Sequence, residues 1–126
     1  MTNVQEKIIL NKHIDHLCDL YVKERYYTII SKAKNLSLKY KDSVALLNLL
    51  GMSNAKINKH VCAINNYKKA IELCPNNATT FFHLGLLYHD LNQFVEAIKS
   101  YKRAVFINPS YIDALFNLSY AYIDLE

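Results

Sequence analysis

The chain repeats itself at one fixed interval, and this repeat period limits the folds open to it. The interval from Gly51 to Gly85 is the same as the interval from Pro75 to Pro109. A repeat of this kind is one supersecondary unit, which buries its apolar face only by stacking on its neighbours. When residues 44–77 are placed on 78–111 without a gap, the following ten pairs are identical: Leu50/Leu84, Gly51/Gly85, Asn58/Asn92, Val61/Val95, Ala63/Ala97, Ile64/Ile98, Tyr67/Tyr101, Lys68/Lys102, Ala70/Ala104 and Pro75/Pro109.

Apolar residues inside each unit follow the spacing of two helices. In 78–111, Phe81, Leu84 and Tyr88 lie three and four residues apart, and a second stripe with this spacing follows in 97–104. That spacing places side chains on one face of a helix. Each unit is therefore predicted to be a pair of helices.

Glycine and proline, which occur only twice each, mark the same places in both units. Gly51 and Gly85 fall inside predicted helices, where glycine costs about 1 kcal/mol relative to alanine. They indicate positions where two helices approach closely. Pro75 and Pro109 end the second helix of each pair, because proline cannot donate the helical hydrogen bond. So few turn residues exclude a β-sandwich or barrel.

Taken together, these residues resemble the tetratricopeptide repeat, a unit of about 34 residues. The motif is carried by Phe81-x-x-Leu84-Gly85-x-x-Tyr88, Ala97-x-x-x-Tyr101-x-x-Ala104 and Pro109. The resemblance implies an all-α fold, a right-handed α-solenoid of antiparallel helix pairs with about three and a half repeats and seven helices.

The whole chain is expected to form one domain of this kind, as a piece of a longer protein. It is divided into a degenerate first repeat, two regular repeats and a half repeat or capping helix, at residues 1–43, 44–77, 78–111 and 112–126.

The first repeat is the least regular. Tyr26, Ile30 and Ala33 are spaced like the stripe of the second helices, but aligning them with the stripe that begins at Ala63 needs a shift three residues longer than the repeat period. This shift predicts a connection through Lys39–Asp42 that is three residues longer than in the other repeats. An unrelated helical hairpin that caps the solenoid is the alternative.

The histidines and cysteines of the chain are expected to be ordinary surface or core residues. His13 and His16 lie close in sequence to Asp15, Cys18 and Asp19, but no second element supplies a ligand, so no metal site is expected. Cys62 and Cys74 are expected to be small core residues. Three cysteines without a C-x-x-C pair indicate reduced thiols and an intracellular, most simply cytoplasmic, protein.

Other functional classes find little support. No paired carboxylates, serine elbow or His-Glu-x-x-His motif is found, so neither an enzyme nor a cofactor is expected. The net charge of +4 is small for a nucleic-acid binder, and much of it is expected on the outer face of second helices. No apolar run of about 18 residues is present, so no membrane span is expected.

The resemblance implies a concave surface that is lined by the first helices and binds peptides or partner helices. Phe82 and Phe116 are predicted to be exposed aromatic anchors, and the rows Asn48–Phe82–Phe116 and Met52–Leu86–Tyr120 are predicted to run side by side. The predicted groove residues are Asn48, Leu49, Met52, Thr79, Phe82, His83, Leu86, His89, Asp113, Phe116, Asn117 and Tyr120.

This groove is apolar and aromatic, and it lacks the lysine, asparagine and arginine clamp with which many family members hold the acidic tails of heat-shock chaperones. The sequence thus predicts a protein-interaction scaffold that binds a partner peptide or helix. The alternatives are a substrate-recognition or oligomerisation arm of a larger enzyme or multi-subunit assembly. Self-association through residues 112–126 is left open, because Leu115, Leu118 and Tyr122 would have no covering helix.

Overall fold

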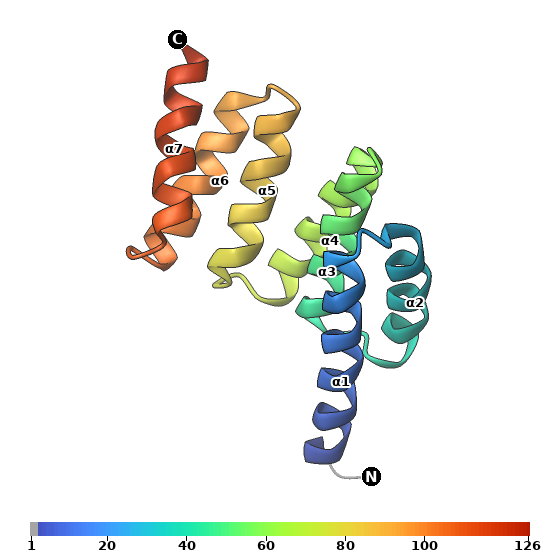
Figure 1. Ribbon diagram of the computed structural model, residues 1–126. Helices are drawn as coiled ribbons and strands as arrows, with labels where there is room; N and C mark the ends of the chain where they lie inside the picture. Colours follow the sequence, from blue (N-terminus) through green and yellow to red (C-terminus); the bar gives the residue numbers. More distant parts are fainter. Residues whose placement is uncertain (1–2) are drawn as a thin grey trace. The chain divides into compact units, whose positions relative to one another are not determined.

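The repeat period governs the helix boundaries as well as the sequence. The computed structural model describes residues 3–126, in which the second helices of successive pairs begin at 26, 60 and 94 (Figure 1). The seven helices of this part of the chain are α1 (Asn3–Val22), α2 (Tyr26–Lys39), α3 (Val44–Lys56), α4 (His60–Leu73), α5 (Ala78–Asp90), α6 (Phe94–Ile107) and α7 (Ile112–Leu125). The prediction of an all-α chain of helix pairs is confirmed.

The turn inside each helix pair has the same backbone conformation. Glu24, Asn58 and Asn92 follow one another at the repeat period and have φ angles of 58°, 63° and 59°. This left-handed region is costly for most side chains and is tolerated best by glycine and asparagine. The turn thus favours asparagine at positions 58 and 92, although Glu24 adopts the same conformation in the first pair.

The connection between α2 and α3 corrects the prediction for the start of the chain. The connection after α2 spans residues 40–43 and is as long as the connections at 74–77 and 108–111. The expected three extra residues in Lys39–Asp42 are absent, and the longer shift is wrong. Residues 10–43 follow the same period as the later repeats, and α1 extends seven residues further towards the N-terminus. Residues 1 and 2 of the predicted first repeat lie outside the described residues.

The sequence of the first repeat was aligned wrongly with the later repeats because its core side chains differ in size. The second helices α4 and α6 carry small, large and small residues in order, as in Ala97, Tyr101 and Ala104, all of them fully buried. At the same positions α2 carries Ile29, Ala33 and Leu36. The sizes are inverted, so a search for the repeated pattern slides by three residues to find a match.

By contact, the chain divides into two units at residue 66, and each has its own core. The core of unit 1 consists of Leu17, Ile29, Ala33, Leu46, Leu49 and Leu50, from α1, α2 and α3. The core of unit 2 consists of Phe82, Ala97, Ile98, Tyr101, Ala104, Ala114 and Ala121, from α5, α6 and α7.

Two of the first helices begin with matching caps. The Ser43 hydroxyl accepts a hydrogen bond from the amide of Leu46 at 3.3 Å, and the Asn77 side chain accepts one from Thr80 at the same distance. These side chains satisfy a backbone donor at the helix start. In α7 the N-cap position is held by Tyr111, whose side chain forms no capping hydrogen bond.

Gly85 lies directly against the ring of Tyr101, with no room for a side chain between them. A Cβ atom at Gly85 would lie 2.5 Å from the ring carbon Cε1 of Tyr101 and 2.6 Å from Cδ1. The ring is fully buried, so it has no free space to move into. In unit 1 the corresponding positions are held by Leu17 and Ala33, both buried in one core, so the large and small partners have changed places.

The substitution Gly85→Ala should lower the stability of unit 2 by up to about 2 kcal/mol. The added methyl overpacks the contact with Tyr101, which costs about 1–3 kcal/mol, and alanine returns about 1 kcal/mol of helix propensity. Thermal unfolding followed by circular dichroism measures the change. Ser119→Ala is the matched control, since Ser119 holds the same position on α7 and is exposed. An unchanged melting temperature for Gly85→Ala would show that the contact relaxes without cost.

The exchanged sizes in unit 1 predict a non-additive pair of substitutions. Ala33→Tyr alone should destabilise the protein by about 1–3 kcal/mol through overpacking, and Leu17→Gly alone by about 2–5 kcal/mol through loss of a buried side chain. The double variant rebuilds the arrangement of Gly85 and Tyr101. Its loss of stability, measured by urea unfolding, should be at least about 1 kcal/mol smaller than the sum of the single losses. Strict additivity would contradict a direct contact between the two positions.

Candidate functional site

Phe82, which was predicted to be an exposed groove anchor, is a core residue. Only 9% of its surface is exposed. Its ring lies 5.0 Å from the ring of Tyr111 and 6.1 Å from that of Tyr101, centroid to centroid. The prediction of an exposed Phe82 is wrong.

The reason lies in the number of neighbours that α5 has. A single apolar stripe was assigned to helix packing, but α5 contacts both α6 and α7. A helix with two neighbours buries a wider arc of its surface than a helix with one. The residues of α5 that are buried are Thr80, Phe82, Leu84, Gly85 and Leu87.

The corresponding aromatic residue on α7 is exposed, as predicted. Phe116 stands one repeat period after Phe82 and has 61% of its surface exposed, and Tyr120, one turn further along α7, has 58%. On α5 this place is covered by Tyr111, which precedes α7. No side chain of the described residues takes that role for Phe116. Two neighbouring aromatic side chains are thus presented to solvent by one helix.

A cavity of about 310 Å³ lies beside Tyr120, between α5 and α7. Its lining residues are Leu86, His89, Asp90, Asn117, Tyr120 and Asp124. Four of these were predicted to belong to the groove, and the structure brings them together. The two aspartates were not predicted, and they give the cavity a strongly acidic rim.

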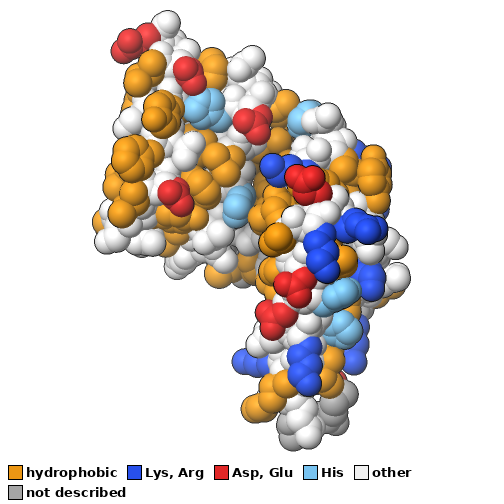
Figure 2. Space-filling model, in the orientation of Figure 1, with side chains coloured by type: hydrophobic (Ala, Val, Ile, Leu, Met, Phe, Trp, Pro, Cys, Tyr) orange, Lys and Arg blue, Asp and Glu red, His pale blue; other side chains and the backbone are white. Residues whose placement is uncertain are grey.

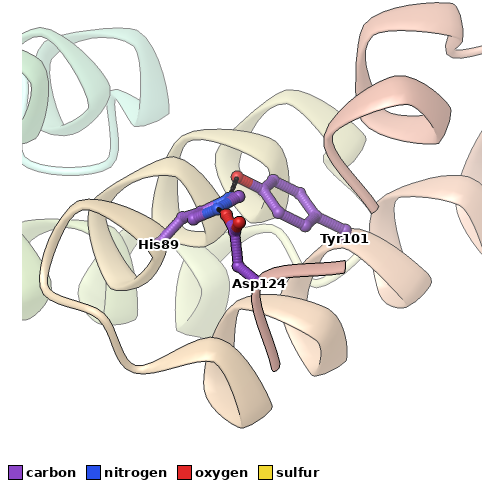
Figure 3. A network of polar contacts seen from close by, with 3 residues as sticks. All are labelled: His89, Tyr101 and Asp124. Atoms are coloured by element: carbon purple, nitrogen blue, oxygen red, sulfur yellow. Dashed lines mark hydrogen bonds and ion pairs between the residues drawn. The ribbon is translucent and has the colours of Figure 1, made fainter. Parts of the chain in front are cut away.

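A polar network fixes one wall of the cavity (Figure 3). Nε2 of His89 and the Oδ2 atom of Asp124 are 2.6 Å apart, and Nδ1 of His89 lies 3.4 Å from the hydroxyl of Tyr101. The edge of the His89 ring meets Phe94 at 5.5 Å between centroids. His89 is therefore held by residues of α6 and α7. Burial, and then the charge of Asp90, raise the pKa of Tyr101, so its hydroxyl keeps its proton.

The two aspartates could have been found by extending the repeat comparison. Asp90 and Asp124 are identical residues one repeat period apart, and each follows a predicted groove residue, Leu86 or Tyr120, by four positions. Residues four apart lie on the same face of a helix. The repeat comparison covered residues 112–126 only at the packing and groove positions, which do not include this pair of aspartates.

The other predicted groove residues of unit 2 have mixed surroundings. Thr79 and Asp113 are exposed, and the amide of Asn117 donates a hydrogen bond to the backbone oxygen of Asp113 at 2.7 Å. His83 is half-buried and stacked on Tyr67, with ring centroids 6.3 Å apart and planes at 11°. Burial lowers the pKa of His83, which favours its neutral form.

In unit 1 only part of the predicted groove reaches the surface. Asn48 and Met52 are half-buried, whereas Leu49 is buried in the core of this unit. The assignment of Leu49 to the groove is therefore wrong, because α1 and α2 contribute to the core that surrounds α3. The row that joins Met52 to Leu86 and Tyr120 stays a prediction.

The cysteines and the histidines of α1 form no reactive site in the described chain. All three cysteines are free, and Cys62 is exposed, which corrects its assignment to the core. Partial burial, and then the charges of Asp15 and Asp19, raise the pKa of Cys18 and so disfavour the reactive thiolate. Among residues 3–126, no group of three or more His, Cys, Asp or Glu side chains is arranged so that it could hold a metal ion.

Comparison with known families agrees with this architecture. The family described as "TPR repeat" matches residues 57–92 and 85–125, which together make up more than half of the chain. The chain belongs to the tetratricopeptide repeat family. None of the curated proteins matches it in sequence.

Solved structures show the same fold. An O-GlcNAc transferase mutant of Thermobaculum terrenum is similar over 96% of this chain, with a TM-score of 0.86 and 20% identity. The first TPR domain of human RPAP3 is similar over 89% of this chain and 88% of its own, with a TM-score of 0.85 and 16% identity. The first TPR of Spaghetti (RPAP3), bound to the HSP90 peptide SRMEEVD, is similar over 96% of this chain and 94% of its own. Its TM-score is 0.84 and its identity 16%.

These similarities confirm the predicted fold class, an all-α solenoid of tetratricopeptide type. This chain spans 23% of the length of the transferase. No helix among residues 3–126 has the length and apolar character required to cross a membrane.

The different surroundings of the two phenylalanines predict opposite outcomes for one substitution. Phe82→Ala should destabilise unit 2 by about 3–5 kcal/mol, because it opens a cavity among Tyr101, Tyr111 and their neighbours. Phe116→Ala should change the stability by less than about 0.5 kcal/mol, as expected for an exposed side chain. Urea unfolding of the two variants measures both. Equal losses would contradict the burial of Phe82.

Proposed function

We propose that the chain is a protein-interaction module, without catalytic activity of its own, that binds a partner segment along α5 and α7 of unit 2. The observation that carries this proposal is the exposure of Phe116 and Tyr120 beside the cavity between the two helices. Exposed aromatic side chains next to a concave surface are the usual anchors of a protein interface.

Further support comes from the arrangement of the cavity wall. Leu86 offers an apolar surface, while His89 is held in place by its hydrogen bond with Asp124 and by Tyr101. A surface that is already ordered loses little entropy when a partner binds. The bound HSP90 peptide in the first TPR of Spaghetti shows that a domain of this fold holds a peptide.

The compartment and the wider context are part of the same proposal. Three free cysteines favour a reducing environment, most simply the cytoplasm. The similarity to one part of a transferase supports the alternative that this domain serves as an arm of a larger enzyme.

Photo-crosslinking tests the proposed surface. A photoreactive phenylalanine analogue at Phe116 should form crosslinks to a partner in cell extract, because this side chain lies on the binding surface. The matched control is the analogue at Phe106, which is 76% exposed but lies on α6. In protein without the analogue, Phe116→Ala combined with Tyr120→Ala should abolish binding of the partner that crosslinking identifies. The melting temperature should be unchanged. Equal crosslinking from both positions, or capture that survives the double substitution, would contradict the proposal.

Self-association is a second candidate, favoured by the outer face of α7. Leu115 and Tyr122 are 41% and 42% exposed, whereas Phe81 and Tyr88, at the same positions on α5, pack against the core of unit 2. A helix face that is packed in one repeat and largely exposed in the next is available to pack against another helix.

If this face joins two copies, sedimentation at rising protein concentration should show a shift from monomer to dimer. Leu115→Lys together with Tyr122→Lys should keep the protein monomeric, because two charges would be buried in the contact. Leu38→Lys is the control, at an exposed leucine of α2. A protein that stays monomeric at all concentrations excludes this function for α7.

A further inference from the structure

Charges are segregated between the helices of unit 2. The helices α5 and α7 contain Asp90, Asp113 and Asp124 and not one lysine or arginine. The basic residues of this unit lie on α4 and α6 and are Lys68, Lys69, Lys99, Lys102 and Arg103. The surface that carries the exposed aromatic residues is therefore negative, although the chain as a whole has a net charge of +4.

The negative charges are concentrated where the cavity is. Asp90 and Asp124 both line it, and Asp113 lies one turn before Asn117, another lining residue. In Figure 2, red and pale-blue side chains lie among orange ones over α7 and α5. Within residues 3–126, Asp90 forms no ion pair, and Asp124 is paired only with His89. The cavity thus has carboxylate oxygens that can accept hydrogen bonds from a cation.

We propose that this cavity receives a lysine or arginine side chain from a partner segment that is basic and apolar. This inference rests on the proposed function and names the chemistry of the partner. The charged head would lie between the carboxylates of Asp90 and Asp124. Its aliphatic stem would lie along Leu86 and the ring of Tyr120, since long basic side chains bury their stems on apolar surfaces. Apolar residues next to it in the partner would cover Phe116.

Charge complementarity separates this partner from the two main alternatives. An acidic peptide would bring like charges beside Asp90 and Asp124, and a phosphate backbone would do the same. The cation, in contrast, gains attraction from two carboxylates and from the face of an aromatic ring. The geometry of the site thus favours a basic segment over an acidic one.

Three short labelled peptides test the inference. Leucine alternates with lysine in the first, with glutamine in the second and with glutamate in the third. Fluorescence anisotropy at low salt should show the lysine peptide binding about tenfold more tightly than the glutamine peptide, and the glutamate peptide most weakly. Asp90→Asn with Asp124→Asn should remove this preference. Glu72→Gln with Glu96→Gln is the matched control, because it changes the net charge equally but on α4 and α6, and it should leave the preference intact.

The substitution of Asp124 also changes its hydrogen bond with His89, so Asp90→Asn alone serves as a second variant that keeps this contact. It should still reduce the preference about threefold. The inference is overturned if the three peptides bind equally, if the control pair has the same effect as the aspartate pair, or if none of the peptides binds.

The variant Phe116→Ala with Tyr120→Ala distinguishes this failure from failure of the proposed function. This variant should bind all three peptides more weakly, with the order of their affinities unchanged. Equal binding of the three peptides that still depends on Phe116 and Tyr120 would leave the interaction surface in place and overturn only the basic partner. Binding that depends on the lysines but is unchanged by the loss of both aromatic side chains would contradict the proposed binding surface on α5 and α7.

Discussion

The contact between Gly85 and the ring of Tyr101 connects the core of unit 2 with the proposed binding surface. On one side the ring fills the space that the missing side chain of Gly85 leaves. On another side it meets Phe82, and its hydroxyl reaches His89 in the wall of the cavity. Because the ring is fully buried, its position is fixed by packing rather than by solvent. One close approach of two helices thus determines where the cavity lies.

Much of the fold follows from the sequence, because the constraints on it are local and periodic. In the two regular repeats the turns carry asparagine at a positive φ and the first helices carry glycine, and both recur at the same period. The register of the first repeat was predicted wrongly because Leu17 and Ala33 satisfy the same packing demand with the sizes exchanged. A pattern of residue types does not reveal such an exchange, since only the sum of the two volumes is constrained.

The site was less accessible to prediction, because exposure depends on which helices are neighbours. Phe82 and Phe116 occupy the same repeat position, yet one is buried by Tyr111 and the other is open. Asp90 and Asp124 repeat at the period of the fold but belong to no packing stripe. A search for apolar stripes passes over such residues, although they determine the charge of the surface on which a partner would lie.

The exchange of sizes between Leu17 and Ala33 has a consequence for how the chain assembles. In a protein made of similar repeats, a helix can pair with the wrong neighbour while the chain is folding. Leu17 on α1 occupies the place where Tyr101 on α6 needs a glycine, so these two helices are poor partners for each other. Ala33 on α2, in turn, would leave a void against Gly85. At this contact the first helix pair and the third therefore need side chains of different sizes, so that α1 and α2 are poor partners for α6 and α5.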